Sequence, residues 1–382
     1  MQRNQYDYVP PIPQDQARSQ LAVIRAKNKI ATLDANFKSL TYPEPDLRDN
    51  TPDQGAIPKF RLRLEAESQK PNYDCGLLDR LPVELWHSTL YHLDVQSLMS
   101  LAETNRRGTE IVRSLPHVAA LAGHAPTLLR SIRALRTGAF FSLHRLAECM
   151  TSYKCEVCDD FGAYLYLLTC KRLCRRCFNT DRRFHPLLRK SIEDNMNIPI
   201  GVLNSLPHAT NFEGVYLPSR RFVESMEIFD LNAVWSAGIL QYGSETNLMG
   251  AIIDHFNNVA KESYAQSLRS RRPTKNPYLF DLSRNSSSDI QRLLQESGSP
   301  RDYYYVRSWL AVVQAPVFNS ELNEVNHGRY CKACKGHSRF PVDGSRRFNE
   351  QTFRKHLEDC GPIRMGLHPE YDYALRRDAK EA

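Results

Sequence analysis

The chain has 382 residues, of which 41% are hydrophobic and 25% charged, and it carries a formal net charge of +8. This length allows two or three domains with a substantial core. The charge is small for a dedicated nucleic-acid binder of this mass, and no repeat of about 20 to 50 residues indicates a propeller or a leucine-rich solenoid. With 22 prolines against 17 glycines, we expect a mainly helical fold with many irregular segments.

The first residues, Met1 to Gln20, contain no apolar stretch of the kind that a secretory signal needs. No later run approaches the roughly 18 apolar residues of a membrane span. We therefore expect a soluble intracellular protein, cytoplasmic and/or nuclear, that does not contact a membrane. In a reducing compartment, clustered cysteines bind metal more often than they form disulfides.

The N-terminal 76 residues combine one helix with a linker. Apolar residues recur every three or four positions from about Asp15 to Leu40, which predicts an amphipathic helix; they are Val23, Ala26, Ile30, Leu33, Phe37 and Leu40. Such a helix docks on its own protein or recruits a partner. Prolines and acids from Tyr42 to Pro58 indicate a linker.

Residues 77–118 predict three short helices. Pro82 fits a first helical turn, Asp94 fits the cap of a second helix, and Gly108 fits its end. A module of about forty residues cannot bury all of its leucines internally, so part of its apolar surface must meet another chain or the rest of this one.

This segment resembles the F-box family on a pattern of leucines that follows a Leu-Pro pair. The matching positions are Leu81, Pro82, Glu84, Leu85, Leu90, Leu93, Leu98 and Leu101. The resemblance implies that these residues bind a Skp-family adaptor, which links the chain to a cullin in an SCF ubiquitin ligase. Thr89 and the pair Gln96-Ser97 depart from the family pattern. The other reading is an ordinary three-helix part of a larger core.

Residues 119–190 contain a helical connector and then two C-x-x-C pairs. Cys155 and Cys158 form the first pair, and Cys174 and Cys177 form the second. This spacing is typical of a closed, structural zinc site. Cys170 is an alternative ligand to Cys174. The basic residues from Lys171 to Lys190 either offset the thiolate charge or meet a phosphate backbone.

The order of the parts resembles a group of fungal F-box proteins in which a cysteine-rich knuckle follows the box. Residues 191–326 are then expected to be a mostly helical region that binds a protein target. We find no catalytic constellation in it. The tyrosine run from Arg301 to Val306 favours a strand or a core edge.

Residues 327–365 contain a second metal pattern, before a tail of residues 366–382. Cys331 and Cys334 form a C-x-x-C pair, and His356 and Cys360 share one face of a helix that Asn349 caps and Gly361 ends. His337 is the rival ligand to His356, and His327 is a weaker one.

Together these features predict a three-helix F-box followed by a mixed, mostly helical receptor domain with irregular zinc-stabilised segments. The predicted function is the non-catalytic substrate-receptor subunit of an SCF-type ubiquitin ligase, with two structural zinc ions. Its target is not identified by the sequence. The alternative is a zinc-dependent nucleic-acid-binding regulator, which is disfavoured because no aromatic stacking platform accompanies the basic residues.

Overall fold

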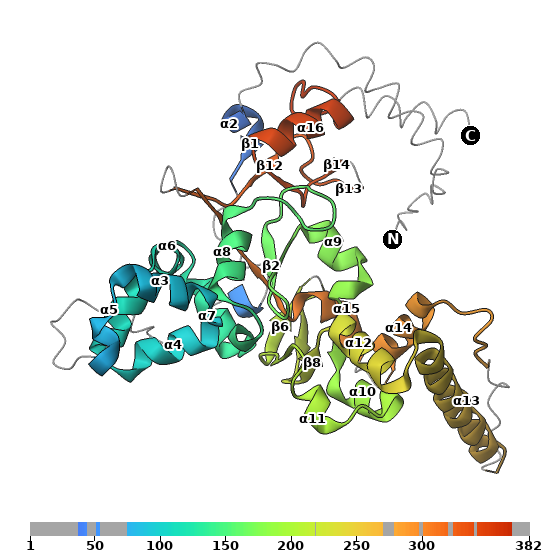
Figure 1. Cartoon of the computed structure of the whole chain (residues 1–382). Helices are drawn as coiled ribbons and strands as arrows, with labels where there is room; N and C mark the ends of the chain where they lie inside the picture. Colours follow the sequence, from blue (N-terminus) through green and yellow to red (C-terminus); the bar gives the residue numbers. More distant parts are fainter. Residues whose placement is uncertain are drawn as a thin grey trace.

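The structure is a computed structural model, and it describes residues 37–43, 51–53, 75–217, 219–269, 279–297, 301–319, 324–339 and 342–368. Helices dominate its regular structure, and the strands form small two- and three-stranded sheets (Figure 1). This confirms the expected class at a coarse level. The predicted N-terminal helix lies outside the described residues except for α2 (Phe37–Leu40), and most of the predicted linker does too.

A run of short helices forms the first part of the body: η3 (Gly76–Arg80), α3 (Val83–His92), α4 (Val95–Thr104), α5 (Arg106–Ser114), α6 (Pro116–His124), α7 (Pro126–Ala134), η4 (Thr137–Phe140) and α8 (Leu143–Thr151). Polar caps start several of them. Asp94, Asn105 and Ser142 each accept a backbone N–H at the beginning of α4, α5 and α8. The three short helices predicted for residues 77–118 correspond to α3, α4 and α5.

Gly108 has a different role from the predicted one. Helix α4 ends at Thr104, four residues earlier, and Gly108 lies inside α5. A Cβ atom at this position would lie only 2.4 Å from the carbonyl oxygen of Leu101. The residue is therefore small because α4 and α5 pack closely there, and the prediction that it ends a helix is wrong.

The central sheet joins two distant parts of the chain. Strand β2 (Tyr164–Tyr166) lies between β3 (Lys171–Leu173) and β9 (Val312–Gln314), and both pairings are antiparallel. All three residues of β2 are buried. The helix α9 (Arg175–Thr180) follows β3 directly. Because β9 comes some 140 residues later in the chain, this sheet connects the first half of the protein to the second.

The side chain of Arg172, in β3, lies inside this junction and is only 1% exposed. Its guanidinium donates hydrogen bonds to the carbonyl oxygens of Cys149, Gly162, Ala315 and Pro316. Burial lowers the pKa of Arg172 to about 10, so the group stays charged at neutral pH. One side chain thus joins the end of α8, the loop before β2 and the segment after β9.

A second hydrophobic core lies among helices of the middle region. Its elements and their neighbours are η5 (Arg182–Phe184), β4 (Leu187–Leu188), α10 (Arg189–Met196), α11 (Ile200–Leu203), β5 (His208–Thr210), β6 (Gly214–Tyr216), β7 (Arg221–Val223), β8 (Glu227–Phe229), α12 (Leu231–Tyr242), α13 (Glu245–Arg269) and α14 (Ser287–Glu296). The long helix α13 projects from the body (Figure 1). The region is helical as expected, with a sheet in the order β4-β8-β5 and a hairpin β6–β7 added.

The tyrosine run forms a helix, α15 (Arg301–Val306), followed by the turn η6 (Arg307–Trp309), so the predicted strand is wrong. Tyr303 is fully buried, and its hydroxyl donates to the carbonyl of Pro186. Burial of Tyr303 agrees with the other prediction for this run, that it lies at the edge of the core.

The C-terminal module has its own small core. Its elements are β10 (Val317–Asn319), β11 (Glu324–Asn326), β12 (Arg329–Cys331), β13 (Ser338–Arg339), β14 (Val342–Asp343), β15 (Arg347–Phe348) and α16 (Glu350–Cys360). Asn349 caps α16 and Gly361 ends it, as predicted.

A segment from the N-terminal region completes this module. Strand β1 (Thr41–Tyr42) pairs with β12, the phenyl rings of Phe37 and Phe353 lie edge to face at 5.4 Å, and α2 and α16 lie together (Figure 1). A second short piece, η1 (Thr51–Asp53), contacts α7, β6 and β9.

Replacing Arg172 by methionine tests the central junction. Four buried carbonyl oxygens lose their donor, so we expect the free energy of unfolding to fall by at least about 3 kcal/mol. Urea denaturation of the full chain measures this change. The control is Arg183→Met, which removes an exposed ion pair with Asp181 and is expected to cost about 1 kcal/mol or less. Equal stability of the two variants would contradict the role given to Arg172.

Candidate metal centres

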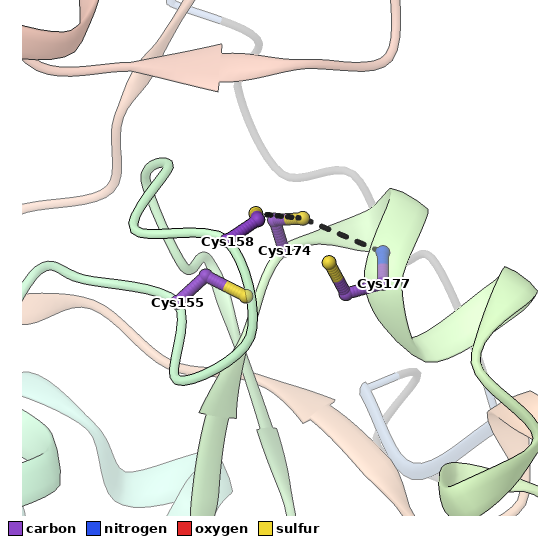
Figure 2. Close-up of side chains that lie close together, drawn as sticks. All are labelled: Cys155, Cys158, Cys174 and Cys177. Atoms are coloured by element: carbon purple, nitrogen blue, oxygen red, sulfur yellow. Dashed lines mark hydrogen bonds between the residues drawn. The ribbon is translucent and has the colours of Figure 1, made fainter.

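The first candidate centre gathers four cysteine thiols at one end of the central sheet (Figure 2). Cys155 and Cys158 lie in the turn before β2, and Cys174 and Cys177 lie at the start of α9. The four sulfur atoms are all within 4.8 Å of one another, and the Sγ atoms of Cys158 and Cys174 are 3.6 Å apart. The two predicted C-x-x-C pairs therefore meet as one group of four.

Backbone hydrogen bonds shape each half of this group. The Cys155 N–H donates to the Asp160 carbonyl and the Asp159 N–H donates to the Cys155 carbonyl, which closes a tight turn around Cys158. Cys174 is the N-cap of α9, and its sulfur accepts the Cys177 N–H at 3.4 Å. Such N–H···S bonds stabilise a thiolate at the beginning of a helix.

The thiols influence one another's ionisation strongly. Hydrogen bonds from Cys158, Cys174 and Cys177 hold the pKa of Cys155 far below its usual range. Hydrogen bonding to Cys155 in turn raises the pKa values of Cys174 and Cys177. Without a cation only part of the set ionises, whereas a divalent ion makes four thiolates stable together. The donor set therefore fits a metal ion.

Cys170 is not part of this group. It lies in the turn between β2 and β3 with a positive φ of 48°, and its carbonyl accepts a hydrogen bond from the Cys149 thiol. The structure thus places Cys174, the predicted ligand, with the other three cysteines, and Cys170 in the core.

The second candidate centre combines Cys331, Cys334, His356 and His368, whose donor atoms also lie within 4.8 Å of one another. The Nε2 atom of His356 is 3.3 Å from the Cys334 sulfur. The Nε2 atom of His368 is 3.4 Å from the Cys331 sulfur and 3.6 Å from that of Cys334. All four residues are buried.

His368 is held in this position by a second contact. Its Nδ1 atom donates to the carbonyl of Gly361, the residue that ends α16, at 2.9 Å. This bond sets the tautomer that leaves the Nε2 lone pair directed at the two sulfurs. The side chain therefore has the arrangement of a metal-binding histidine.

The predicted fourth ligand, Cys360, lies elsewhere. Its sulfur contacts the Nδ1 atom of His356 at 3.4 Å, while the Nε2 atom on the other side of the ring faces Cys334. Cys360 and His356 do share a helix face, as predicted, but the imidazole separates Cys360 from the group of four. The fourth member of the donor group is therefore His368, from the segment predicted to be a tail, and not Cys360 as predicted. His337 and His327 are both exposed and outside the group.

Four of the eight basic residues between Lys171 and Lys190 are engaged within the protein. Arg172 binds carbonyl oxygens, the Arg175 guanidinium lies 5.1 Å from the centre of the Trp309 ring, and Arg183 pairs with Asp181. Arg189 pairs with Glu227 and Glu193. Internal contacts therefore engage half of the expected basic strip.

The residues expected to bind an adaptor divide into two sets. Leu81, Pro82, Glu84 and Leu85 are exposed at the start of α3. Leu90 and Leu98 are each only 2% exposed within the protein's own core, and Leu93 and Leu101 are half-buried against it. The second set stabilises the helices from inside, because these side chains face the packed interior. Leu90 and Leu98 are therefore not available for the direct adaptor contact that the sequence predicted.

Comparisons of the chain with protein-family models, with curated proteins and with solved structures each found no match. Within the described segments, no helix combines the length and the hydrophobicity that a membrane crossing requires.

Replacing His368 tests the second centre. The full chain should retain two zinc ions through gel filtration, whereas His368→Asn should retain one, because an amide is a poor zinc ligand. Elemental analysis of the purified proteins measures the content. Cys360→Ser is the matched control and should keep both ions. Loss of an ion from Cys360→Ser together with full content in His368→Asn would restore the ligand set expected from the sequence.

Proposed function

We propose that this protein is the substrate-receptor subunit of an SCF-type ubiquitin ligase. It binds a Skp-family adaptor through residues 77–118 and a protein target through its metal-containing C-terminal part. The observation that carries the proposal is a group of exposed apolar side chains in η3 and around the start of α3, which we call the adaptor face. It consists of Leu77, Leu81, Val83 and Leu85, which are 74%, 42%, 51% and 52% exposed.

The adaptor face is unusual because its neighbours are packed. Trp86 and Leu90, which come next in α3, are buried against the rest of the helical core. Four large apolar side chains exposed within nine consecutive residues favour a protein interface, since single exposed leucines are common but so many within a short segment are not. The F-box resemblance falls on this same segment and indicates which partner it takes.

The adaptor face is also connected rigidly to the first metal centre. Helix α3 packs on α8, which leads directly into the turn of Cys155, and one continuous hydrophobic cluster extends from Trp86 to Val317. A receptor of this kind does no bond chemistry. It holds a target at a fixed place near a ubiquitin-charged enzyme and so raises the effective concentration of target lysines.

Zinc is the metal that we propose for both centres. Four cysteines, or two cysteines with two histidines, are the ligand sets that structural zinc sites use. Soft sulfur donors disfavour magnesium and calcium, which prefer oxygen ligands. With four protein donors each, the centres act as cross-links that fold the receptor part.

The alternative, a zinc-dependent nucleic-acid-binding regulator, loses part of its support. Its basis was the two metal patterns together with the basic strip, and in that strip Arg172, Arg175, Arg183 and Arg189 have partners inside the protein. Cations that are already paired release few counterions on binding a phosphate backbone.

Substitutions in the adaptor face test the proposal. Leu81→Ala combined with Leu85→Ala should weaken binding of a purified Skp-family adaptor at least about tenfold, because large apolar side chains at the centre of an interface carry much of its affinity. Co-precipitation and calorimetry measure this loss.

Leu240→Ala, on α12, is the matched control, since this leucine is 84% exposed and lies far along the chain from the adaptor face. It should bind like the unmodified protein. Adaptor binding that survives the double substitution, or that is missing from the unmodified chain, would refute the ligase role.

A further inference from the structure

Helices α4 and α7, which Figure 1 shows in the first part of the body, border a cleft of 230 Å³. Its walls come from one face of α4, from the C-terminal end of α7 and from the turn that follows α7, and η4 contributes to its lining. None of the lining residues belongs to the two metal centres or to the adaptor face. The cleft is therefore separate from the sites described above.

One wall of the cleft is a polar face of α4. Gln96, Ser100 and Glu103 follow one another at spacings of four and three residues, which places them on the same side of the helix. All three line the cleft and are exposed. Glu103 forms an ion pair with Arg133 of α7, so a charged contact links the two walls.

The rest of the lining includes apolar and tightly packed residues. Met99 is only 9% exposed, and Ile132 is fully buried. A Cβ atom at Gly138 would lie 3.0 Å from the backbone nitrogen of Gln96 and 3.2 Å from the Cγ2 atom of Ile132. Helix η4 thus packs directly against both walls, which fixes the shape of the cleft.

Arg136 gives the cleft its uncompensated charge. This residue lines the cleft and is exposed, and its guanidinium forms no ion pair or hydrogen bond within the part of the chain that the structure describes. Glu103, the acidic residue of the lining, already pairs with Arg133. The lining therefore has a net positive charge, and Arg136 carries it.

Two further features of the cleft concern its free polar groups. The side-chain amide of Gln96 makes no hydrogen bond among the described residues, so it can donate to a ligand. Arg136 has a positive φ of 57° in the turn from α7 to η4. Glycine and asparagine adopt this conformation at less cost than arginine, so backbone geometry does not explain the arginine.

We propose that this cleft binds a small organic carboxylate with an apolar chain. The carboxylate accepts two parallel N–H bonds from the guanidinium of Arg136, and the Gln96 amide supplies a third donor. The apolar chain packs on Met99 and Ile132. Apolar lining with a few well-placed polar groups is typical of small-molecule sites. The site is independent of the proposed ligase function, because it requires no adaptor and no target.

The volume of the cleft limits the size of the ligand. An apolar cavity of about 150 Å³ binds benzene, so by proportion the cleft of 230 Å³ takes about nine non-hydrogen atoms. A straight-chain acid of this size is heptanoate, and it serves as the probe. Calorimetry and saturation-transfer NMR of the full chain with heptanoate should show saturable binding.

Two related probes separate the contributions of charge and chain. We expect 1-heptanol, which lacks the carboxylate, and acetate, which lacks the chain, each to bind at least about tenfold more weakly than heptanoate. Binding of 1-heptanol as tight as that of heptanoate would show a cleft without preference for an acid. That result, or the absence of saturable heptanoate binding, would overturn the proposal.

Arg136→Asn tests the cation without harming the fold. Asparagine accepts a positive φ, so the variant should melt no lower than the unmodified chain, but it should bind heptanoate about tenfold more weakly. Arg106→Asn is the matched control, because Arg106 is exposed in α5 and outside the cleft, and it should bind normally. Equal heptanoate affinity of the two variants would refute the role of Arg136.

A further pair of variants locates the bound acid. Ser100→Trp fills the cleft from its exposed wall and should abolish heptanoate binding. The adaptor-face variant, Leu81→Ala with Leu85→Ala, should bind heptanoate like the unmodified chain, whatever its affinity for the adaptor. The opposite outcome, loss of binding in the adaptor-face variant and full binding in Ser100→Trp, would place the acid at the adaptor face and contradict the proposal.

Discussion

Four sulfur atoms held within 4.8 Å of one another are the constraint on which the architecture depends. Thiolates at this distance repel each other, and a cation among them would convert that repulsion into a cross-link. Such a cross-link would join the turn before β2 to the start of α9, and β2 is also the central strand that β3 and β9 share. The adaptor face, through α3 and α8, and the second half of the chain, through β9, are both positioned by this one junction.

The second centre also brings the donor atoms of separate chain segments together. It joins β12, α16 and the segment after Gly361, and the sheet that it supports is completed by β1, almost 300 residues earlier in the chain. The Lys332 N–H donates to the Leu40 carbonyl, so the N-terminal segment is bound by the metal module itself. Two local centres thus organise contacts between very distant residues.

Local patterns were readable from the sequence, whereas contacts between distant residues were not. The C-x-x-C spacings, the cap at Asp94 and the helix from Asn349 to Gly361 depend on neighbours a few residues away, and the structure has all of them. His368 was missed because only the turn after Gly361 returns it to Cys331, and a lone histidine near the end of the chain carries no spacing signal. Gly108 was misread because a glycine required by helix packing looks the same as one that ends a helix. The tyrosine run has strand propensity, yet it forms the helix α15 with Tyr303 bonded to the carbonyl of Pro186, a contact between residues 117 positions apart that no local pattern predicts.

Amide hydrogen exchange of the full chain, with and without its metal, tests the central claim most directly. If the two centres hold the molecule together, removal of the metal by a strong chelator should abolish protection in β2, β3, β12 and β1. The amides of α10 and α12, which belong to the metal-free second core, should keep theirs. Unchanged protection in β2 and β3 after the metal has left the protein would contradict the account, because the central sheet would then be stable without the sulfur-bound cation.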